Sequence, residues 1–190
     1  LKNKGAGGIF LSRSEYGPRA LGARSIIGLA SDKTAQLRLN IKTKFRESFR
    51  PFAPLVLEKD FSKYFSDFKN CNVNKNYMLF TFNVKNSIKK TVSKINNSDN
   101  FEKIVNQERS TLPAITHVDY SARVQVLSKK APKIIYEFYS RLIKELNEDV
   151  LINTSFNVRG EPIVDSPMDA FSAFMRTDLD FLLIDNFLLI

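Results

Sequence analysis

The chain has 190 residues, 43% of them hydrophobic, which is enough for one domain with a buried core, and no apolar run approaches the length of a membrane span. One cysteine and one histidine exclude an internal disulfide framework and argue against a zinc site held by protein ligands, so we assign no metal-binding residues. The net charge of +9 invites a polyanionic partner, but the lysines are scattered among asparagines, so we expect a solvated basic surface in a cytoplasmic protein and regard nucleic acid as an unlikely partner.

The first half of the chain predicts short strands around one helix. Residues 7–11 and 53–57 are apolar and predict strands. Residues 32–44 predict a helix with Ser31 or Asp32 as its N-cap and apolar residues at Ala35, Leu37 and Ile41. Residues 77–84 form the clearest long strand candidate. Four aromatic side chains at helical spacing predict core contacts: Phe61, Tyr64, Phe65 and Phe68.

The second half alternates strands with two helices. Residues 114–118, 123–127 and 149–152 predict strands, and residues 132–147 predict a strongly amphipathic helix. A further helix starts with Ser166 as N-cap and Pro167 in its first turn, and residues 181–190 predict a strand pair. The polar residues 85–110 predict either a surface helix pair or a mobile insertion.

These elements together predict an α+β fold, with a mixed twisted sheet flanked by helices in a single domain. We expect the functional site at the ends of strands. Because residue 1 is Leu rather than Met and residues 1–5 carry no start of a helix or strand, we expect the chain to be part of a longer protein.

One polar motif follows the predicted strand 149–152. Ser155 and Asn157 stand just past this strand and before a Gly-Glu-Pro turn. Small hydroxyl and amide groups at a strand end can bind phosphate or ribose oxygens. The alternative is an Asx-type turn, in which both side chains bond their own backbone.

A basic motif precedes it by more than 100 residues. Lys42, Lys44, Arg46 and Arg50 are followed by prolines, and in an extended segment positions 42, 44 and 46 would face one way and converge on an anion. A solvent-facing basic edge is the alternative. Most arginines fall inside such motif-like segments and suggest a cluster aimed at a small anion: Arg13, Arg19, Arg24, Arg46, Arg50, Arg123 and Arg159.

Two further groups of residues could serve a site. The glycine-bounded loop around Arg19 offers backbone N–H groups to an oxyanion, although its spacing is not that of a Walker motif. His117, Asp119 and Arg123 could act as a base, its orienting group and an anion ligand. A structural, hydrogen-bonded histidine is the alternative.

Four segments, taken in order, carry a family resemblance. Residues 15–26 (EYGPRALGARSI), 44–54 (KFRESFRPFAP), 117–123 (HVDYSAR) and 153–157 (NTSFN) resemble the C-terminal domain of the NodU/CmcH-type O-carbamoyltransferases. The resemblance spans nearly the whole chain and implies a YrdC-like fold. It also implies that carbamoyl phosphate and ATP, the latter with Mg, meet here and give carbamoyl adenylate and pyrophosphate.

The same resemblance implies roles for individual residues. Lys44 and Arg46 would be the catalytic pair that recognises phosphate and the carbamoyl group, while Ser155 and Asn157 would contact nucleotide phosphate or ribose. Three arginines would complete the set of cations around the anion: Arg19, Arg24 and Arg123. His117 and Asn153 could also belong to the site. The carbamoyl group would pass to a hydroxylated small molecule or saccharide in a separate N-terminal, metal-binding, sugar-kinase-like domain. Because that domain is absent here, this chain alone is expected to be incompetent for the complete transfer.

The sequence departs from the family pattern at two places, and two other functions are alternatives to the one that the resemblance implies. Tyr120 and Ser121 stand where the family usually has Gly-Thr, which could aim Arg123 differently, and residues 85–110 match nothing in the family. The first alternative is a YrdC-type threonylcarbamoyladenylate synthase in tRNA modification, against which the Gly-Pro-Arg-Ala-Leu-Gly segment speaks. The second is a nucleic-acid-binding module based on the net charge of +9.

Overall fold

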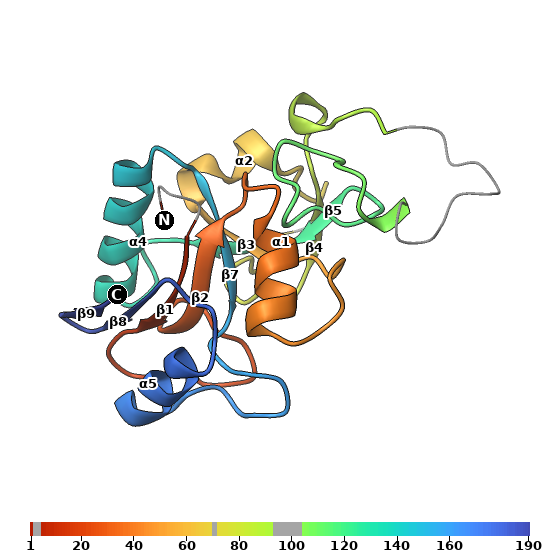
Figure 1. Ribbon diagram of the computed structural model, residues 1–190. Helices are drawn as coiled ribbons and strands as arrows, with labels where there is room; N and C mark the ends of the chain where they lie inside the picture. The colour runs from red at the N-terminus through yellow and green to blue at the C-terminus, as the bar shows by residue number, and fades with distance from the viewer. Residues whose placement is uncertain (2–4, 70–71, 93–103) are drawn as a thin grey trace.

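A computed structural model describes residues 1, 5–69, 72–92 and 104–190 and shows a mixed α+β fold (Figure 1). Among these residues, one mixed sheet has the strand order β6-β3-β7-β2-β1-β8-β9. Its strands are β1 (Ala6–Phe10), β2 (Arg24–Leu29), β3 (Ala53–Leu57), β6 (Gln125–Leu127), β7 (Val150–Ser155), β8 (Phe181–Ile184) and β9 (Phe187–Leu189). A second, two-stranded sheet pairs β4 (Thr81–Asn83) with β5 (Ser121–Arg123).

The helices are mostly short. They are α1 (Ala35–Arg38), α2 (Phe61–Tyr64), α4 (Lys133–Leu146) and α5 (Pro167–Met175), with a π-helix at Leu39–Thr43 and 3₁₀ turns at Glu58–Asp60 and Asn86–Ile88. No helix of the described residues is long and apolar enough to cross a membrane.

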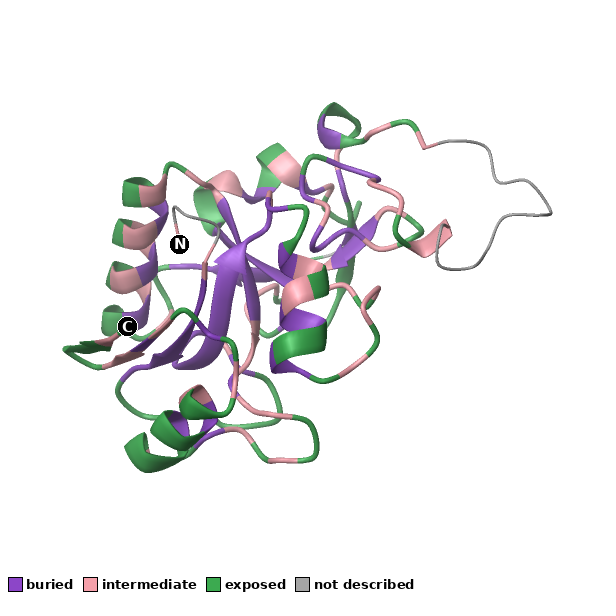
Figure 2. Cartoon of the chain, viewed as in Figure 1, coloured by how far each residue is buried: buried purple, intermediate pink, exposed green. Residues whose placement is uncertain are grey.

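At the centre of the main sheet, β7 pairs antiparallel with both β2 and β3, and β2 and β3 are buried on both faces, because a hydrophobic core covers each face. Successive residues of a strand point to opposite faces, so Ile26 and Ile152 belong to one core and Ile27 and Leu151 to the other. The first core is shared with α1, α5 and β4, and the second with α4. Figure 2 shows the buried strands between these layers, with the buried stripe of α4 facing the sheet.

The predicted elements with strong local signals are confirmed. Strands occur at β1, β3 and β7, the amphipathic segment is α4, and β8 pairs antiparallel with β9. The side chain of Ser166 accepts a bond from the Asp169 N–H and Asp169 bonds the N-cap backbone in return, with Pro167 following, so α5 begins with a capping box.

The helix predicted over residues 32–44 is wrong in length and in its buried face. Only Ala35–Arg38 is α-helical, and the Asp32 carboxylate bonds Thr34 beside it. Leu37 and Ile41 are 52% and 50% exposed. The π-helix adds a residue to the turn, so side chains beyond position 38 rotate away from the expected face and bury Leu39, Asn40 and Thr43 instead.

Two predicted strands differ from the structure. The strand over 77–84 is confirmed only for Thr81–Asn83, with an isolated pairing at Val84, because Met78 has a φ of 54° and the chain turns there. Residues 114–118 form turns, in which the Thr116 hydroxyl bonds the Leu112 carbonyl. Residues 123–127 divide between two sheets, with β5 ending at Arg123 and β6 starting at Gln125.

The aromatic segment and the polar insertion differ from expectation in part. Phe61 and Phe65 are buried, as predicted, but α2 ends at Tyr64, and Phe68 is 42% exposed with its ring centroid 5.0 Å from that of Phe82. In the insertion the structure describes one 3₁₀ turn and an isolated pairing of Lys89 with Ser110. Residues 93–103, in the middle of the predicted insertion, lie outside the described residues.

Candidate anion-binding site

The site is built at the end of the central strand β7, whose last residue is Ser155. The Ser155 hydroxyl donates to Oδ1 of Asn157 at 2.7 Å, and the Asn157 amide donates to the Glu161 carbonyl at 2.8 Å. Asn157 therefore bonds the backbone of its own turn, as the Asx-type alternative predicts, whereas the Ser155 hydroxyl bonds a side chain. Binding of phosphate or ribose oxygens by these residues stays a prediction.

The ammonium group of Lys44 lies inside this turn. It donates to the Ser155 carbonyl, to the Asn157 carbonyl at 3.1 Å and to Asn157 Oδ1 at 2.8 Å. The residue is 6% exposed. Burial, and then the neighbouring charge of Arg46, lower the pKa of Lys44 to about 7, so near neutral pH this site can gain or lose a proton.

A backbone kink separates Lys44 from Arg46. Phe45 has a φ of 47°, a left-handed conformation that is unusual for a bulky residue. The Arg159 guanidinium donates to the Phe45 carbonyl at 3.1 Å, and the Arg46 N–H donates to the Asn40 carbonyl at 3.0 Å. The expected convergence of alternating positions 42, 44 and 46 is therefore wrong: Lys42 lies in the π-helix and forms an exposed ion pair with Asp178 at 2.7 Å.

Asn40 holds the Arg46 side chain in place. Its Oδ1 accepts a bond from Arg46 Nε at 2.6 Å, while its amide donates to the carbonyls of Ser48 and Arg50 at 3.0 and 2.8 Å. The Arg46 guanidinium lies over the Phe52 ring, 4.8 Å from its centroid. Burial, and then the charge of Arg50, lower the pKa of Arg46 to about 10.

Two adjoining hollows open on either side of Arg46 and Ser155. The first, of about 240 Å³, is lined by Lys44, Arg46, Glu47, Arg50, Ser155, Asn157, Val158, Arg159 and Gly160. The second, of about 180 Å³, has twelve lining residues, which include Arg19, Arg46, Arg123, Asn153 and Ser155. The structure thus brings together six predicted site residues from four segments, and Asn153 with them.

The second hollow contains three arginines. Within the described part of the chain, Arg19, Arg46 and Arg123 form no ion pair with a carboxylate. Burial, and then Arg19, lower the pKa of Arg123. Positive groups that oppose one another at a strand end favour the binding of an anion.

Arg24 and the backbone N–H groups at the end of the glycine-bounded loop are already bonded within the chain, although Arg19 of the same loop lines the second hollow. The Arg24 guanidinium donates to the carbonyls of Leu11 and Ser12 at 2.9 and 2.8 Å and stacks on the Phe10 ring. The N–H groups of Leu21 and Ala23 both donate to the Glu15 carboxylate at 2.6 Å. This loop therefore binds an anion of its own chain, and Arg24 lines neither hollow.

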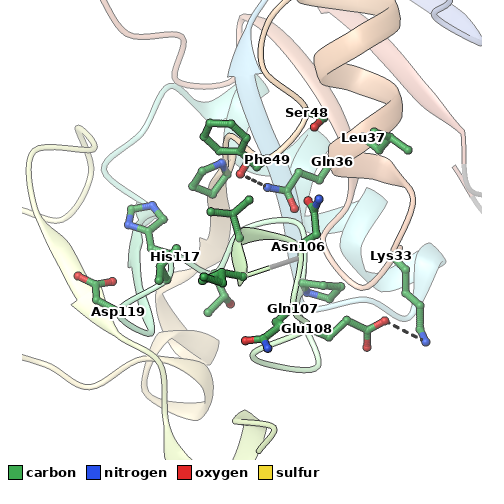
Figure 3. Close-up of a pocket in the computed structure, with 16 residues that line it drawn as sticks. Lys33, Gln36, Leu37, Ser48, Phe49, Asn106, Gln107, Glu108, His117 and Asp119 are labelled. Atoms are coloured by element: carbon green, nitrogen blue, oxygen red, sulfur yellow. Dashed lines mark hydrogen bonds and ion pairs between the residues drawn. The ribbon is translucent and has the colours of Figure 1, made fainter. Parts of the chain in front are cut away.

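His117 lines a different cavity, of about 840 Å³ (Figure 3). Its Nδ1 lies 3.0 Å from the Ser121 hydroxyl, and its backbone N–H donates to the Ser121 carbonyl at 2.8 Å, which fits the structural alternative. Burial lowers the pKa of His117. Asp119 lines the same cavity, but Arg123 lines the 180 Å³ hollow, so the three residues do not share one site.

Some residues of the site received no specific role from the sequence. Arg50 and Arg159 were predicted only as members of an arginine cluster aimed at a small anion, and both line the first hollow. Asn40 had no signal, because its role depends on the π-helix. The described residues contain no group of three or more His, Cys, Asp or Glu side chains that could hold a metal ion.

The fold and the hollows define an α+β domain with a basic, anion-accepting site at the end of its central strand. The chain belongs to the family described as carbamoyltransferase C-terminus, whose model matches residues 1–190. The chain is 43% identical over 182 residues to an uncharacterized protein of Synechocystis, covering 96% of this chain and 29% of that protein.

Nodulation proteins of rhizobia are also similar to this chain. Nodulation protein NolNO of Sinorhizobium fredii is 37% identical over 177 residues, which cover 93% of this chain and 23% of that protein. Nodulation protein U of Azorhizobium caulinodans is 36% identical over 153 residues, with coverages of 80% and 23%. The chain thus spans between about a fifth and a third of the length of the curated relatives it matches.

Proposed function

We propose that this chain is the donor-activating domain of an O-carbamoyltransferase, which binds carbamoyl phosphate and ATP and forms carbamoyl adenylate. The observation that carries the proposal is the meeting of Lys44 and Arg46 with Ser155 and Asn157 at two adjoining, cation-lined hollows. Membership of the carbamoyltransferase C-terminus family supports it.

We assign a different ligand to each of the two hollows. The 180 Å³ hollow is smaller than the roughly 300–1,000 Å³ usual for larger ligands, which suits carbamoyl phosphate. The more open 240 Å³ hollow, with Lys44 and Arg159, would take the phosphates of ATP. Arg46 lines both hollows, so its charge would act on the donor and on the nucleotide at once.

Catalysis here would rest on positioning and charge. In a balanced reaction, water would take the phosphoryl group of carbamoyl phosphate and give inorganic phosphate and carbamate. A carbamate oxygen would then attack the α-phosphorus of ATP and displace pyrophosphate, which gives carbamoyl adenylate. Negative charge develops on both leaving groups, and fixed cations stabilise it without reorganisation. We expect Mg to arrive with ATP, and we assign no protein ligand to it, because Glu47 is the sole carboxylate in the lining of the two hollows.

Transfer to a hydroxylated small molecule or saccharide would take place in a further, N-terminal domain of the same protein. The greater length of the relatives is consistent with such a domain. The use of ATP suits the cytoplasm as the compartment.

Calorimetry on the 190-residue chain tests donor and nucleotide binding. We expect saturable binding of carbamoyl phosphate and of ATP, weakened about tenfold or more in Arg46→Ala, because a charge-assisted hydrogen bond contributes about 1.5–3 kcal/mol. Arg141→Ala, on the exposed face of α4, is the matched control. An unaffected Arg46→Ala variant, or no binding by folded wild-type protein, would rule the proposal out.

Pyrophosphate release separates the alternatives. Release that needs carbamoyl phosphate and ATP together supports the proposed reaction. Release that requires threonine and bicarbonate would instead identify a threonylcarbamoyladenylate synthase. Submicromolar RNA binding with a steep salt dependence in a filter assay would favour a nucleic-acid module.

A further inference from the structure

Asn153 lines the 180 Å³ hollow and carries a buried hydrogen-bond acceptor that is unpaired among the described residues. The residue lies in β7, is 1% exposed and lines that hollow. Its Nδ2 donates to the Ala20 carbonyl at 3.2 Å and to Gln125 Oε1 at 2.5 Å. Its Oδ1 is buried and has no hydrogen-bond partner among the described residues. Buried polar atoms are nearly always paired, so an unpaired one at a hollow points to a ligand.

The neighbouring side chain fixes which atom of Asn153 is unpaired. Gln125 is 2% exposed, and its Nε2 donates to the Leu21 carbonyl at 2.7 Å, which directs Oε1 toward Asn153. Turning the Asn153 amide over would place Oδ1 against Oε1 and the Ala20 carbonyl, where no donor exists. The acceptor is therefore held in one orientation by the loop that also carries Arg19.

The remaining polar groups of the hollow are mostly donors. Arg19, Arg46 and Arg123 offer N–H groups to an anion, and the Ser155 hydroxyl is already bonded to Asn157. A ligand that satisfies this set carries negatively charged oxygens at one end and an uncharged N–H donor at the other. Carbamoyl phosphate has this pattern, because its amino group and its phosphate lie at opposite ends.

We propose that Asn153 Oδ1 accepts a hydrogen bond from the amino group of the carbamoyl donor and so selects carbamoyl phosphate against other acyl phosphates. The inference rests on the proposed function, since it assigns the donor to this hollow. Acetyl phosphate is the informative competitor, because a methyl group replaces the amino group and leaves Oδ1 unpaired. A site built around a hydrogen bond rejects an analogue that lacks it.

The experiment compares three ligands by calorimetry on the 190-residue chain: carbamoyl phosphate, acetyl phosphate and inorganic phosphate. We expect wild-type protein to prefer carbamoyl phosphate over acetyl phosphate by about tenfold or more. In Asn153→Ala the preference should fall to within about twofold, while affinity for inorganic phosphate, which the arginines hold, changes far less. Asn186→Ala, in the exposed turn between β8 and β9, is the matched control and should keep the preference.

A second variant keeps the test decisive if Asn153→Ala does not fold. Gln125→Met leaves Asn153 in place but removes the bond that orients it, and it should also lose the preference. This variant separates an orienting role for Gln125 from a purely structural one, because selectivity would change while phosphate affinity is retained.

The outcomes distinguish this inference from the function on which it rests. Equal affinity of wild-type protein for carbamoyl and acetyl phosphate would overturn the role of Asn153 and leave carbamoyl phosphate binding intact. A preference that persists in both variants would overturn it equally. Binding of none of the three ligands by folded protein would remove the proposed function as well.

Discussion

The Lys44 ammonium donates to Asn157 twice, to the side-chain oxygen at 2.8 Å and to the main-chain carbonyl at 3.1 Å, across 113 positions of sequence. The two motifs that carry most of the chemistry are therefore one structural unit. Removing either side should disturb stability and anion binding together.

Replacing Lys44 by Met should weaken both properties. The apolar stem is kept, but the oxygens of Ser155 and Asn157 lose the bonds from the ammonium group, at a cost of about 1–3 kcal/mol in the free energy of unfolding. Affinity for sulfate should also fall, because one cation of the 240 Å³ hollow is lost. Urea denaturation and calorimetry measure the two effects, with the exposed Lys129→Met as control. A variant as stable and as tight-binding as the control would contradict the assignment.

Anion affinity should depend on pH through Lys44. Because the pKa of Lys44 is lowered to about 7, the free protein loses this positive charge as pH rises past that value. Sulfate does not titrate in this range, so its affinity should fall between about pH 6 and pH 9 for this reason. The dependence should flatten in Lys44→Met; an equally steep curve in that variant would assign the titration to another group.

Stability should change with pH in the opposite direction. The pKa of Lys44 is lowered on folding from 10.5 to about 7, so between these values the unfolded chain binds more protons than the folded chain. The contribution of Lys44 to the free energy of unfolding therefore rises with pH across this window and is constant below it. The measurement is urea denaturation at several pH values, with the Lys44→Met curve subtracted. A difference curve that fell with pH would refute the sign.

Asn40 lines neither hollow, but replacing it should weaken anion binding, because its side chain holds Arg46 in place. In Asn40→Ala, Arg46 Nε loses its acceptor, and the carbonyls of Ser48 and Arg50 lose their donors. We expect destabilisation of about 1–3 kcal/mol and weaker binding of inorganic phosphate. Asn186→Ala is the exposed control. Full phosphate affinity in a destabilised Asn40→Ala variant would show that Arg46 is oriented without Asn40.

The left-handed conformation of Phe45 predicts an inverted order of substitutions. Glycine adopts a φ of 47° without strain, whereas alanine does not, so Phe45→Gly should be more stable than Phe45→Ala by about 1 kcal/mol. At Phe187, exposed in β9, the usual order with alanine more stable should hold. Thermal unfolding of the four variants decides the matter, and the same order at both positions would argue against a strained kink at Phe45.

Local patterns predicted much of the fold. The helical spacing of apolar residues such as Ile135 and Ile143 in α4, and the Ser166-Pro167 helix start, act within a few residues, so the sequence shows them directly. The strand predicted over 77–84 is right only for Thr81–Asn83, and the one over 114–118 is absent. An apolar run does not by itself specify a buried strand, because Leu79 and Val118 are 65% and 54% exposed. The π-helix at Leu39–Thr43 has no periodic signal of its own.

By itself, the sequence determined which residue types could form a site and the four ordered segments that resemble one family. Only the tertiary structure decided how they are used, because contacts such as Lys44 with Ser155 depend on the packing of β7 against β2 and β3. In the folded chain, Arg24 donates to backbone carbonyls, whereas Asn153 Oδ1 is unpaired among the described residues. Both residues stand in motifs that predicted a binding site, so the motifs alone could not separate the two cases. Whether a polar group binds a ligand or its own chain depends on which partners folding brings within bonding distance, and those partners are remote in sequence.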